Sequence, residues 1–379
     1  MQILAVDVGT GTQDILLLRP GLAVENAFKL VMPSPTMIIR RRLQQATQQQ
    51  AAVLLTGVMM GGGPCQWAAT DHLRAGLALY ATPDAARTFN DDLEWVEREL
   101  GIRVLAPEEA RRLTGVTEIR LRDLDAAGLR QALGAFDMEL HPTAAAVAVF
   151  DHGAAPPQVS DRQFRFDYLA SRILESNRLT AFAHRAEDIP GHMTRMQAVA
   201  QSAADLDCPV MVMDTAPAAI LGATLDPASA RQPRQLIANI GNFHTLAFRL
   251  GPQGIEGVFE HHTGLIDRPR LERLLLALAD GTLTHREVFD DHGHGAWLRP
   301  AVPPWRLASE ASLIVTGPRR GMLAGSSLQP YFAVPYGDMM LAGCFGLVAA
   351  LPEHMPELAE WIQQSLAGRD SDRPPWEAE

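Results

Sequence analysis

Two segments far apart in the chain repeat one pattern of apolar and polar positions. Residues 3–18 consist of an apolar strand, a turn of glycine and threonine bearing an acid, and a second apolar strand. Residues 236–248 follow the same plan. Glycines let the chain turn tightly and bring backbone N–H groups close to an anion. Threonine hydroxyls and a carboxylate can then hold phosphate oxygens and a hydrated magnesium ion. The repeat predicts two halves that grip one polyphosphate.

The remaining periodicity indicates strands followed by helices. The strands are apolar rather than alternating, which is typical of sheets covered on both faces. Further strands are predicted at residues 22–32, 51–56, 144–150, 209–213 and 311–315. Helices are predicted at residues 37–50, 91–100, 166–176, 193–204, 268–280 and 356–366. Residues 83–140 have a mainly helical pattern and predict an insertion, and residues 290–304 form a loop rich in histidine and proline.

The length of 379 residues exceeds that of a comfortable single core, so we expect two domains. We expect a first domain at 1–230 containing the helical insertion near 83–140, and a second domain at 231–350. Residues 351–379 are expected to form a C-terminal helix that packs back on the first domain, followed by a disordered tail. The hydrophobic content of 47% is that of an ordinary globular protein, and the apolar runs are too short to cross a bilayer.

Charge and rare residues exclude several classes of function. A net charge of −11 argues against binding to nucleic acid or to an anionic membrane. The N-terminus enters a strand without a basic start or a cleavage site, so we expect a cytoplasmic protein. The wide spacing of Cys65, Cys208 and Cys344 provides neither a disulfide framework nor a C-x-x-C metal site. Lys29 is the only lysine and does not follow a glycine-rich loop, which excludes a Walker A motif.

Five segments occur in the order in which the actin, Hsp70 and sugar-kinase ATPase superfamily carries them, and the chain resembles that superfamily over nearly its whole length. They match its first phosphate loop (residues 7–14), first connecting helix (214–222), second phosphate loop (238–245), adenosine-side turn (314–321) and second connecting helix (337–347). The resemblance implies an α/β fold of two RNase H-like domains with an interdomain nucleotide cleft. It also implies ATP and Mg²⁺ as cofactors.

Three motifs are similar to those of a family labelled putative pyruvate formate-lyase activating enzyme. They read DVGTGTQD at residues 7–14, EHHTG at residues 260–264 and GDMM at residues 337–340. A true activase of that kind holds its iron–sulfur cluster with a C-x-x-x-C-x-x-C motif, which this sequence lacks. We therefore do not expect radical chemistry.

The superfamily resemblance implies roles for the residues of the two turns. Asp7 is expected in the magnesium shell, and Asp214 either takes the acceptor's proton or caps the helix that it opens. Asp14 stands where many sugar kinases carry a basic residue, which argues against simple sugar phosphorylation. His244 either donates to the γ-phosphate or caps its turn, and Asn239 replaces the usual acid of the second loop. Contacts to the nucleotide are expected from Gly9, Thr10, Gly11, Thr12, Gln13, Gly241, Asn242, Phe243, Thr245, Gly317 and Arg320.

Histidines and carboxylates are concentrated near the proposed cleft segments, and together they are good ligands for a transition metal. Neighbouring residues on a strand point to opposite faces, so His261 and His262 are not both expected to bind one ion. The set lacks the spacing of a recognised metal motif, so structural or acid–base roles stay open. The candidate ligands are Asp7, Asp151, His152, Glu260, His261 and His262.

Two main classes of function remain open on sequence grounds, and Asn239 in place of the usual acid leaves a degenerate nucleotide sensor as a third. The first is an ATP-dependent, Mg²⁺-requiring phosphotransferase or ATPase that acts on a small acceptor and closes by a hinge at the connecting helices. A variant of it is metal-assisted carbamoyl or hydantoin chemistry, because the first loop with Asp14 is similar to that of hydantoinase-like relatives. The second is an ATP-driven reactivator of a client enzyme. An enzyme should turn over alone, whereas a reactivator should hydrolyse ATP slowly until its client is present.

Overall fold

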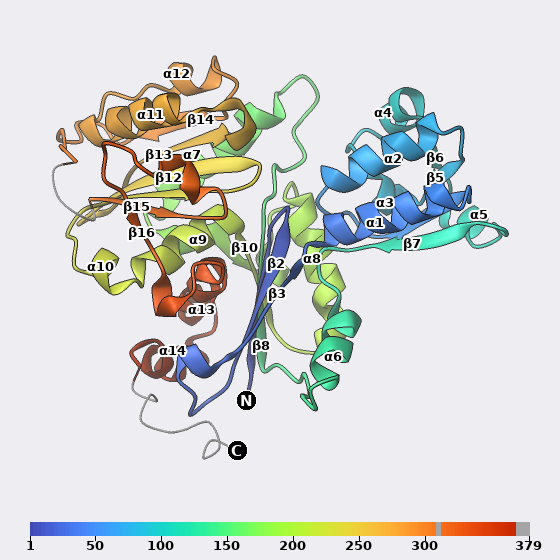
Figure 1. Cartoon of the computed structure of the whole chain (residues 1–379), viewed down its shortest axis with the longest axis horizontal. Helices are drawn as coiled ribbons and strands as arrows, with labels where there is room; N and C mark the ends of the chain where they lie inside the picture. The colour runs from blue at the N-terminus through green and yellow to red at the C-terminus, as the bar shows by residue number, and fades with distance from the viewer. Residues whose placement is uncertain (308–311, 369–379) are drawn as a thin grey trace.

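The computed structural model describes residues 1–307 and 312–368. The tail predicted to be disordered, from residue 369 onward, lies outside these residues. Two six-stranded sheets lie side by side, and a small lobe with a four-stranded sheet projects from the first of them (Figure 1). In residues 1–307 and 312–368, no helix combines the length and the apolar character that a membrane span requires.

The first sheet has the strand order β3-β2-β1-β8-β10-β9. Its strand β1 pairs antiparallel with β2 and parallel with β8, and β10 continues the parallel part. The strands are β1 (Ile3–Val8), β2 (Thr12–Leu18), β3 (Phe28–Pro33), β8 (Ala144–Val149), β9 (Ala183–Arg185) and β10 (Val210–Asp214). Both hairpin strands and the parallel strands were predicted within a few residues of these bounds.

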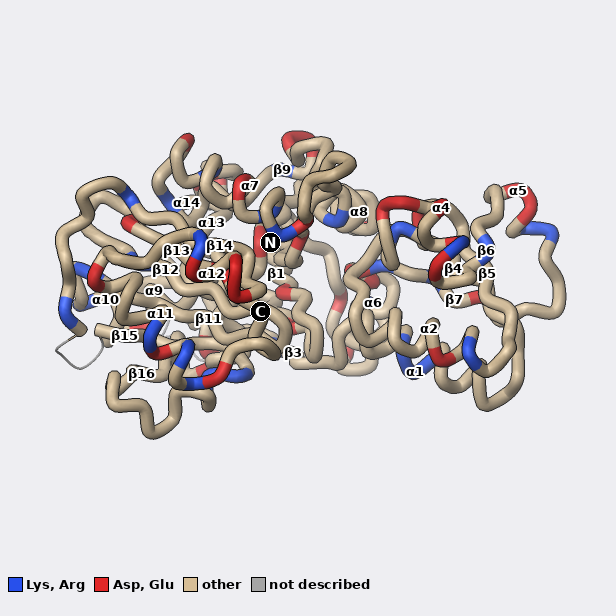
Figure 2. The backbone as a smooth tube through the Cα atoms, turned by 90° about the horizontal axis from the view of Figure 1, so that it is seen from above, with Lys and Arg blue, Asp and Glu red and all other residues tan. Residues whose placement is uncertain are grey.

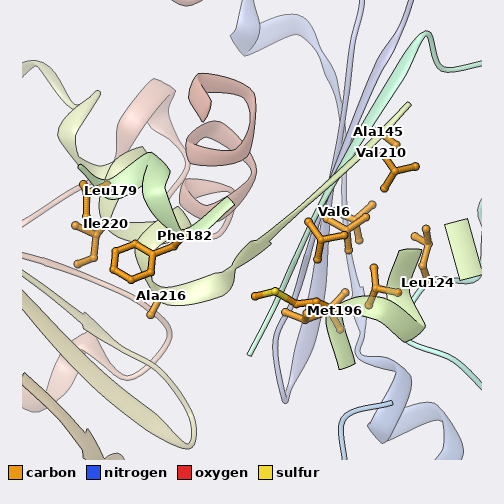
Figure 3. Close-up of a cluster of buried hydrophobic side chains, with 14 of the residues drawn as sticks. Val6, Leu124, Ala145, Leu179, Phe182, Met196, Val210, Ala216 and Ile220 are labelled. Atoms are coloured by element: carbon orange, nitrogen blue, oxygen red, sulfur yellow. The ribbon is translucent and has the colours of Figure 1, made fainter. Parts of the chain in front are cut away.

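The first sheet is buried on both faces. Successive side chains of a strand point to opposite faces, and the side chains on each face belong to a hydrophobic cluster. In β1, Leu4 and Val6 contribute to one hydrophobic cluster, and Ile3 and Ala5 contribute to another. The first cluster includes residues of the helices α6 (Ala126–Gly134), α7 (Asp161–Glu175) and α8 (Thr194–Ala203). Figure 3 shows part of it, with Val6 beside Met196. The opposite cluster includes the C-terminal helices α13 (Ala342–His354) and α14 (Ala359–Leu366).

The second sheet repeats the arrangement of the first, in the order β14-β13-β12-β11-β15-β16. Strand β11 pairs antiparallel with β12 and parallel with β15, as β1 does with β2 and β8. The strands are β11 (Gln235–Ile240), β12 (His244–Gly251), β13 (Gly254–His262), β14 (Gly295–Leu298), β15 (Leu313–Thr316) and β16 (Tyr331–Phe332). Its outer face is covered by α11 (Arg268–Asp280), while α12 (His285–Phe289) leads toward β14. The loop predicted at residues 290–304 therefore contains the edge strand β14.

The two sheets share five strands, three antiparallel ones (β3-β2-β1 and β13-β12-β11) followed by two parallel ones (β8-β10 and β15-β16), and this is the order of two RNase H-like units. The predicted α/β fold class of the actin, Hsp70 and sugar-kinase type is confirmed.

The region from residue 35 to residue 121 forms the small lobe, which corrects the prediction of a helical insertion at 83–140. Its parallel sheet has the order β6-β5-β4-β7, and most of its strands are too short to show a periodicity. The strands are β4 (Val53–Gly57), β5 (Leu79–Ala81), β6 (Arg103–Val104) and β7 (Thr117–Leu121). The helices are α1 (Pro35–Gln48), α2 (Pro64–Arg74), α3 (Pro83–Ala86), α4 (Leu93–Trp95) and α5 (Pro107–Ala110).

Helix α9 (Thr215–Thr224) crosses α13 at a contact between backbones, and the short helix α10 (Pro227–Ala230) follows it. A Cβ atom added to Gly222 would lie 1.7 Å from the carbonyl oxygen of Ala342. One added to Gly346 would lie 1.8 Å from the carbonyl oxygen of Ala218. Because real Cβ atoms do not approach so closely, only glycine fits at these two positions. The two helices therefore pack at close range, with these glycines at the centre of the contact.

Acidic and basic residues are interspersed along both the large sheets and the small lobe (Figure 2). The single lysine, Lys29, lies on β3, with Nζ 5.9 Å from the centre of the Phe345 ring. The net charge of −11 is therefore spread over the chain.

Candidate functional site

A cleft of about 740 Å³ receives residues from both large sheets and from the small lobe. Its volume lies within the range of about 300–1,000 Å³ that is common for small-molecule sites. It is lined by the two glycine turns (residues 7–12 and 241–244), the starts of α9 (215–219) and α13 (339–343), and the turn after β15 (316–318). Two loops of the small lobe (59–63 and 87–92) complete the lining.

The two glycine turns have the same backbone geometry. Gly9 N donates to Thr12 O at 2.9 Å, and Gly241 N donates to His244 O at 2.9 Å. The turns also lie against each other, since a Cβ atom on Gly11 would lie 2.8 Å from Asn242 Nδ2. The two hairpins therefore face one cleft.

The first turn is held in place from outside the hairpin by Ser34 at the start of α1. The Ser34 hydroxyl donates to Thr10 O at 2.5 Å, and its N–H donates to Gly11 O at 3.1 Å. These carbonyls point away from the cleft toward α1. The N–H groups of the turn other than that of Gly9 are then the ones available to an anion.

Two carboxylates, Asp7 and Asp14, stand opposite each other on β1 and β2 and both line the cleft. Burial raises the pKa of Asp7 to about 6, although the Thr215 hydroxyl, which donates to it at 2.6 Å, opposes the shift. Burial and the charge of Asp7 raise the pKa of Asp14 to about 8. Asp14 Oδ1 has no hydrogen-bond partner in the described part of the chain. Paired buried carboxylates with open coordination sites suit a hard cation such as Mg²⁺.

Three residues predicted to contact nucleotide do not line the cleft. Gln13 donates to Pro33 O at 3.0 Å, and the buried hydroxyl of Thr245 pairs with that of Thr263 at 2.9 Å. Both side chains leave the opposite face of their strands, because successive residues of a strand alternate. Arg320, in the turn after Gly317, also lies outside the lining. The other predicted contact residues line it: Gly9, Thr10, Gly11, Thr12, Gly241, Asn242, Phe243 and Gly317.

Asp214 is fully buried and does not line the cleft, so of its two predicted roles the structure shows the cap of α9. It forms an ion pair with the buried Arg165, and it caps α9 by accepting from Ala216 N at 3.3 Å. Arg165 Nε also lies 3.3 Å from Glu260 Oε2. Thr215, one position further along, is the polar residue of α9 that lines the cleft.

Two predicted metal ligands have their polar atoms occupied. The oxygens of Asp151 accept from Gly153 N at 2.8 Å and Met196 N at 2.9 Å. The two ring nitrogens of His261 lie 3.0 Å from the carbonyl oxygens of His262 and Asp291, respectively. Asp151 and His261 therefore have structural roles, as the strand alternation predicted for one of the two adjacent histidines.

A second polar group consists of the rings of His152 and His244, which line the cleft, and those of His262 and His294 beside them. His152 follows β8, His244 begins β12, and His294 immediately precedes β14. Burial, together with the neighbouring histidines and Arg165, lowers the pKa of His294 to about 2. Burial likewise lowers the pKa of His244. These imidazoles are neutral at physiological pH.

The sequence drew attention to His294 only as one of many histidines. Arg165 and the buried pair of Asp123 and Arg195 were not predicted. Arg195 Nε lies 2.7 Å from Asp123 Oδ2, and Asp123 accepts from Gly61 N at 3.2 Å, which fixes the glycine-rich wall of the small lobe. Sequence spacing carried no signal for these contacts, because the partners come from separate elements.

The fold and the cleft define a protein of the actin-like ATPase fold class. Within it, the chain belongs to the family described as "Putative pyruvate format-lyase activating enzyme (DUF1786)", whose model matches residues 60–322. The chain matches none of the curated proteins. Its three cysteines pack in or against three different hydrophobic clusters, so they do not form a common site for an iron–sulfur cluster.

Among solved structures, the ethanolamine utilization protein EutJ from Carboxydothermus hydrogenoformans is 12% identical with a TM-score of 0.32, covering 93% of this chain and 89% of its own. A glycerol dehydratase reactivase is 13% identical with a TM-score of 0.29, and the match covers 93% of this chain and 100% of the reactivase. An exopolyphosphatase-like protein is 11% identical with a TM-score of 0.25, and the match covers 83% of this chain and 65% of that protein. Such distant likenesses do not bear on ligand, activity or partner.

Proposed function

We propose that this protein binds the magnesium complex of a nucleoside triphosphate, with ATP as the preferred nucleotide. It transfers the terminal phosphoryl group of the nucleotide to a small acceptor or to water. The observation that carries the proposal is the pair of identical glycine turns facing one cleft, with Asp7 and Asp14 beside the first turn. The backbone N–H groups of the turns would contact the phosphates. Asp7 and Asp14 would hold a magnesium ion, which would offset the negative charge of the phosphates.

Within this proposal, Asp7 is the principal magnesium-shell residue, held in orientation by the Thr215 hydroxyl. Asp14 is the second carboxylate, and it must lose its proton before the cation binds. His244 stands in the second turn at the position that Thr12 has in the first, where it would reach the terminal phosphate as a neutral donor. The acceptor would occupy the part of the cleft between the phosphates and the wall formed by Gly61–Gly63 of the small lobe. Gly317 would face the base and ribose.

Thermal unfolding with ATP, ADP and GTP, each with and without Mg²⁺, tests the proposal. A ligand present at 100 times its Kd stabilises a folded protein by about 2.7 kcal/mol, which raises the melting temperature measurably. Asp7→Asn should remove the magnesium-dependent part of the shift. Asp71→Asn, at an exposed acid of α2, is the matched control and should keep it. The proposal is wrong if no nucleotide shifts the melting temperature of the wild-type protein.

A second candidate is an ATP-driven reactivator of a client enzyme, and one feature of the small lobe favours it. Trp67 of α2 is 55% exposed, and its ring meets that of Phe243 in the second turn edge-on, at 6.0 Å between centroids. A client bound over Trp67 would therefore contact the wall of the phosphate site. Steady ATP turnover by the protein alone, or in the presence of a small acceptor, would contradict this candidate. Slow basal hydrolysis with tight nucleotide binding would favour it.

A further inference from the structure

Three histidines from distant parts of the chain converge beside the second glycine turn. One ring nitrogen each from His152, His244 and His294 can be chosen so that all three lie within 4.8 Å of one another. His152 belongs to the end of the first sheet, and the other two belong to the second. The backbone N–H of His294 donates to Glu260 O at 2.9 Å, which fixes this residue beside β13. Each of the three histidines therefore lies at or close to the end of a strand, in the segments of β8, β12 and β14.

These rings contain buried nitrogens that lack a hydrogen-bond partner in residues 1–307 and 312–368. They are Nε2 of His244 and both nitrogens of His294. Leaving a buried polar atom unpaired is destabilising, so such atoms require an explanation. The adjacent His261 differs, because each of its ring nitrogens lies 3.0 Å from a carbonyl oxygen.

The neighbours of these rings orient them. The His244 ring stacks on Phe150, with 4.0 Å between centroids and planes 4° apart. Glu260 Oε1, also without a partner among the described residues, lies 3.9 Å from His294 Nδ1. A carboxylate behind one ring nitrogen is the usual arrangement of a metal-binding histidine, and it directs the other nitrogen to the ion. His294 would therefore bind through Nε2.

The charge around the rings also accommodates a cation. Arg165 lies close to them, with its guanidinium carbon 4.4 Å from the centre of the Phe150 ring. Its positive charge is matched by two carboxylates, those of Asp214 and Glu260. With both carboxylates ionised the buried group has a net charge of −1, so a divalent ion brings the local charge to +1.

We propose that His152, His244 and His294 form a binding site for one divalent transition-metal ion, with zinc as the preferred metal and an open coordination position toward the cleft. Imidazole nitrogens favour zinc and its neighbours, whereas Mg²⁺ favours oxygen ligands, so this site is distinct from the carboxylate pair of the first turn. Nitrogens bound tetrahedrally to zinc at about 2.0–2.1 Å are about 3.4 Å apart. Small rotations of rings now within 4.8 Å reach that spacing. His152 and His244 line the cleft, so the fourth position is open to water or to a bound ligand.

Metal binding by the tag-free full-length protein tests the proposal. After treatment with a chelator, the protein is dialysed to equilibrium against Zn²⁺ and its metal content is measured by mass spectrometry. Co²⁺ replaces Zn²⁺ in a parallel titration, because its visible absorption reports the coordination geometry. We expect one ion per chain and the absorption of tetrahedral cobalt coordinated by nitrogen.

The deciding variant is His152→Asn, because this side chain lies on the exposed cleft wall and its replacement should leave the fold intact. It should weaken Zn²⁺ binding at least 100-fold, and His294→Gln should do the same. His141→Ala is the matched control, since this exposed histidine lies far outside the cleft and should leave binding unchanged. Circular dichroism checks the fold of each variant. The proposal is overturned if the wild-type protein fails to bind one equivalent of metal, or if a folded His152→Asn protein binds it as tightly as the wild type.

Discussion

The carboxylate pair of the first turn predicts that this protein loses stability as the pH rises through neutrality, and that Asp14→Asn removes much of the loss. In the folded protein Asp14 faces Asp7 across the hairpin, and its carboxyl group is only 6% exposed. Burial, and then the charge of Asp7, raise the pKa of Asp14 from 3.8 to about 8. The unfolded chain has no such environment, so there the group ionises near its ordinary pKa.

The sign and size of the effect follow from proton linkage. Between pH 4 and pH 8 the folded state keeps a proton on Asp14 that the unfolded state has lost, so the free energy of unfolding falls as the pH rises. One proton of difference corresponds to about 1.4 kcal/mol per pH unit. From pH 6 to pH 8, with the folded-state titration near pH 8 included, Asp14 accounts for a loss of about 2 kcal/mol. Below pH 6 Asp7 contributes a further slope of the same sign, because burial also raises its pKa, to about 6.

Urea unfolding at pH 6, 7 and 8 measures this effect. The wild-type protein should lose about 2 kcal/mol more than Asp14→Asn over that range, because asparagine fills the same space and does not ionise. Asp71→Asn removes an exposed acid instead and should reproduce the wild-type slope. All other titrating groups are common to the proteins, so the difference between their slopes isolates Asp14. Parallel slopes for wild type and Asp14→Asn would refute the reasoning.

Two substitutions test the buried contacts that hold the halves together. Gly346→Ala should destabilise the protein by several kcal/mol or prevent folding, because its Cβ would lie 1.8 Å from Ala218 O. Gly134→Ala, in a helix with free space around this residue, is the control and should be neutral or stabilising. Thermal unfolding compares the two variants. Arg165→Met should cost about 3–5 kcal/mol in urea unfolding, because it leaves Asp214 and Glu260 buried without a cation. The exposed Arg74→Met should change little, and equal stability of the two arginine variants would contradict the role given to Arg165.

The doubled hairpin was predictable because its signals are local. Apolar strands and a glycine turn fall within one short segment, and the same segment occurs twice. The face of each side chain was also within reach of the sequence. Once Asp14 is placed in the cleft, strand alternation places Gln13 on the other face, and the same argument applies to Thr245.

The small lobe and the histidine group could not be predicted in the same way. Strands of two or three residues, such as β5 and β6, are too short to establish a periodicity, so the helices around them dominated the pattern. His152, His244 and His294 meet only because β8, β12 and β14 belong to two sheets placed side by side. The two roles predicted for Asp214 could not be separated, because the sequence contains no sign of Arg165, which pairs with it in the interior.

The two hairpins descend from one plan, yet they no longer carry the same charge. By strand register, the positions of Asp7 and Asp14 in the first half correspond to Asn239 and Leu246 in the second. A symmetric pair would surround a polyanion with four buried acids and repel it from both sides. Here the negative charge is confined to one half, where a cation can offset it, while the other half approaches with amide and imidazole groups. The two hairpins therefore have different chemical roles, and neither could substitute for the other.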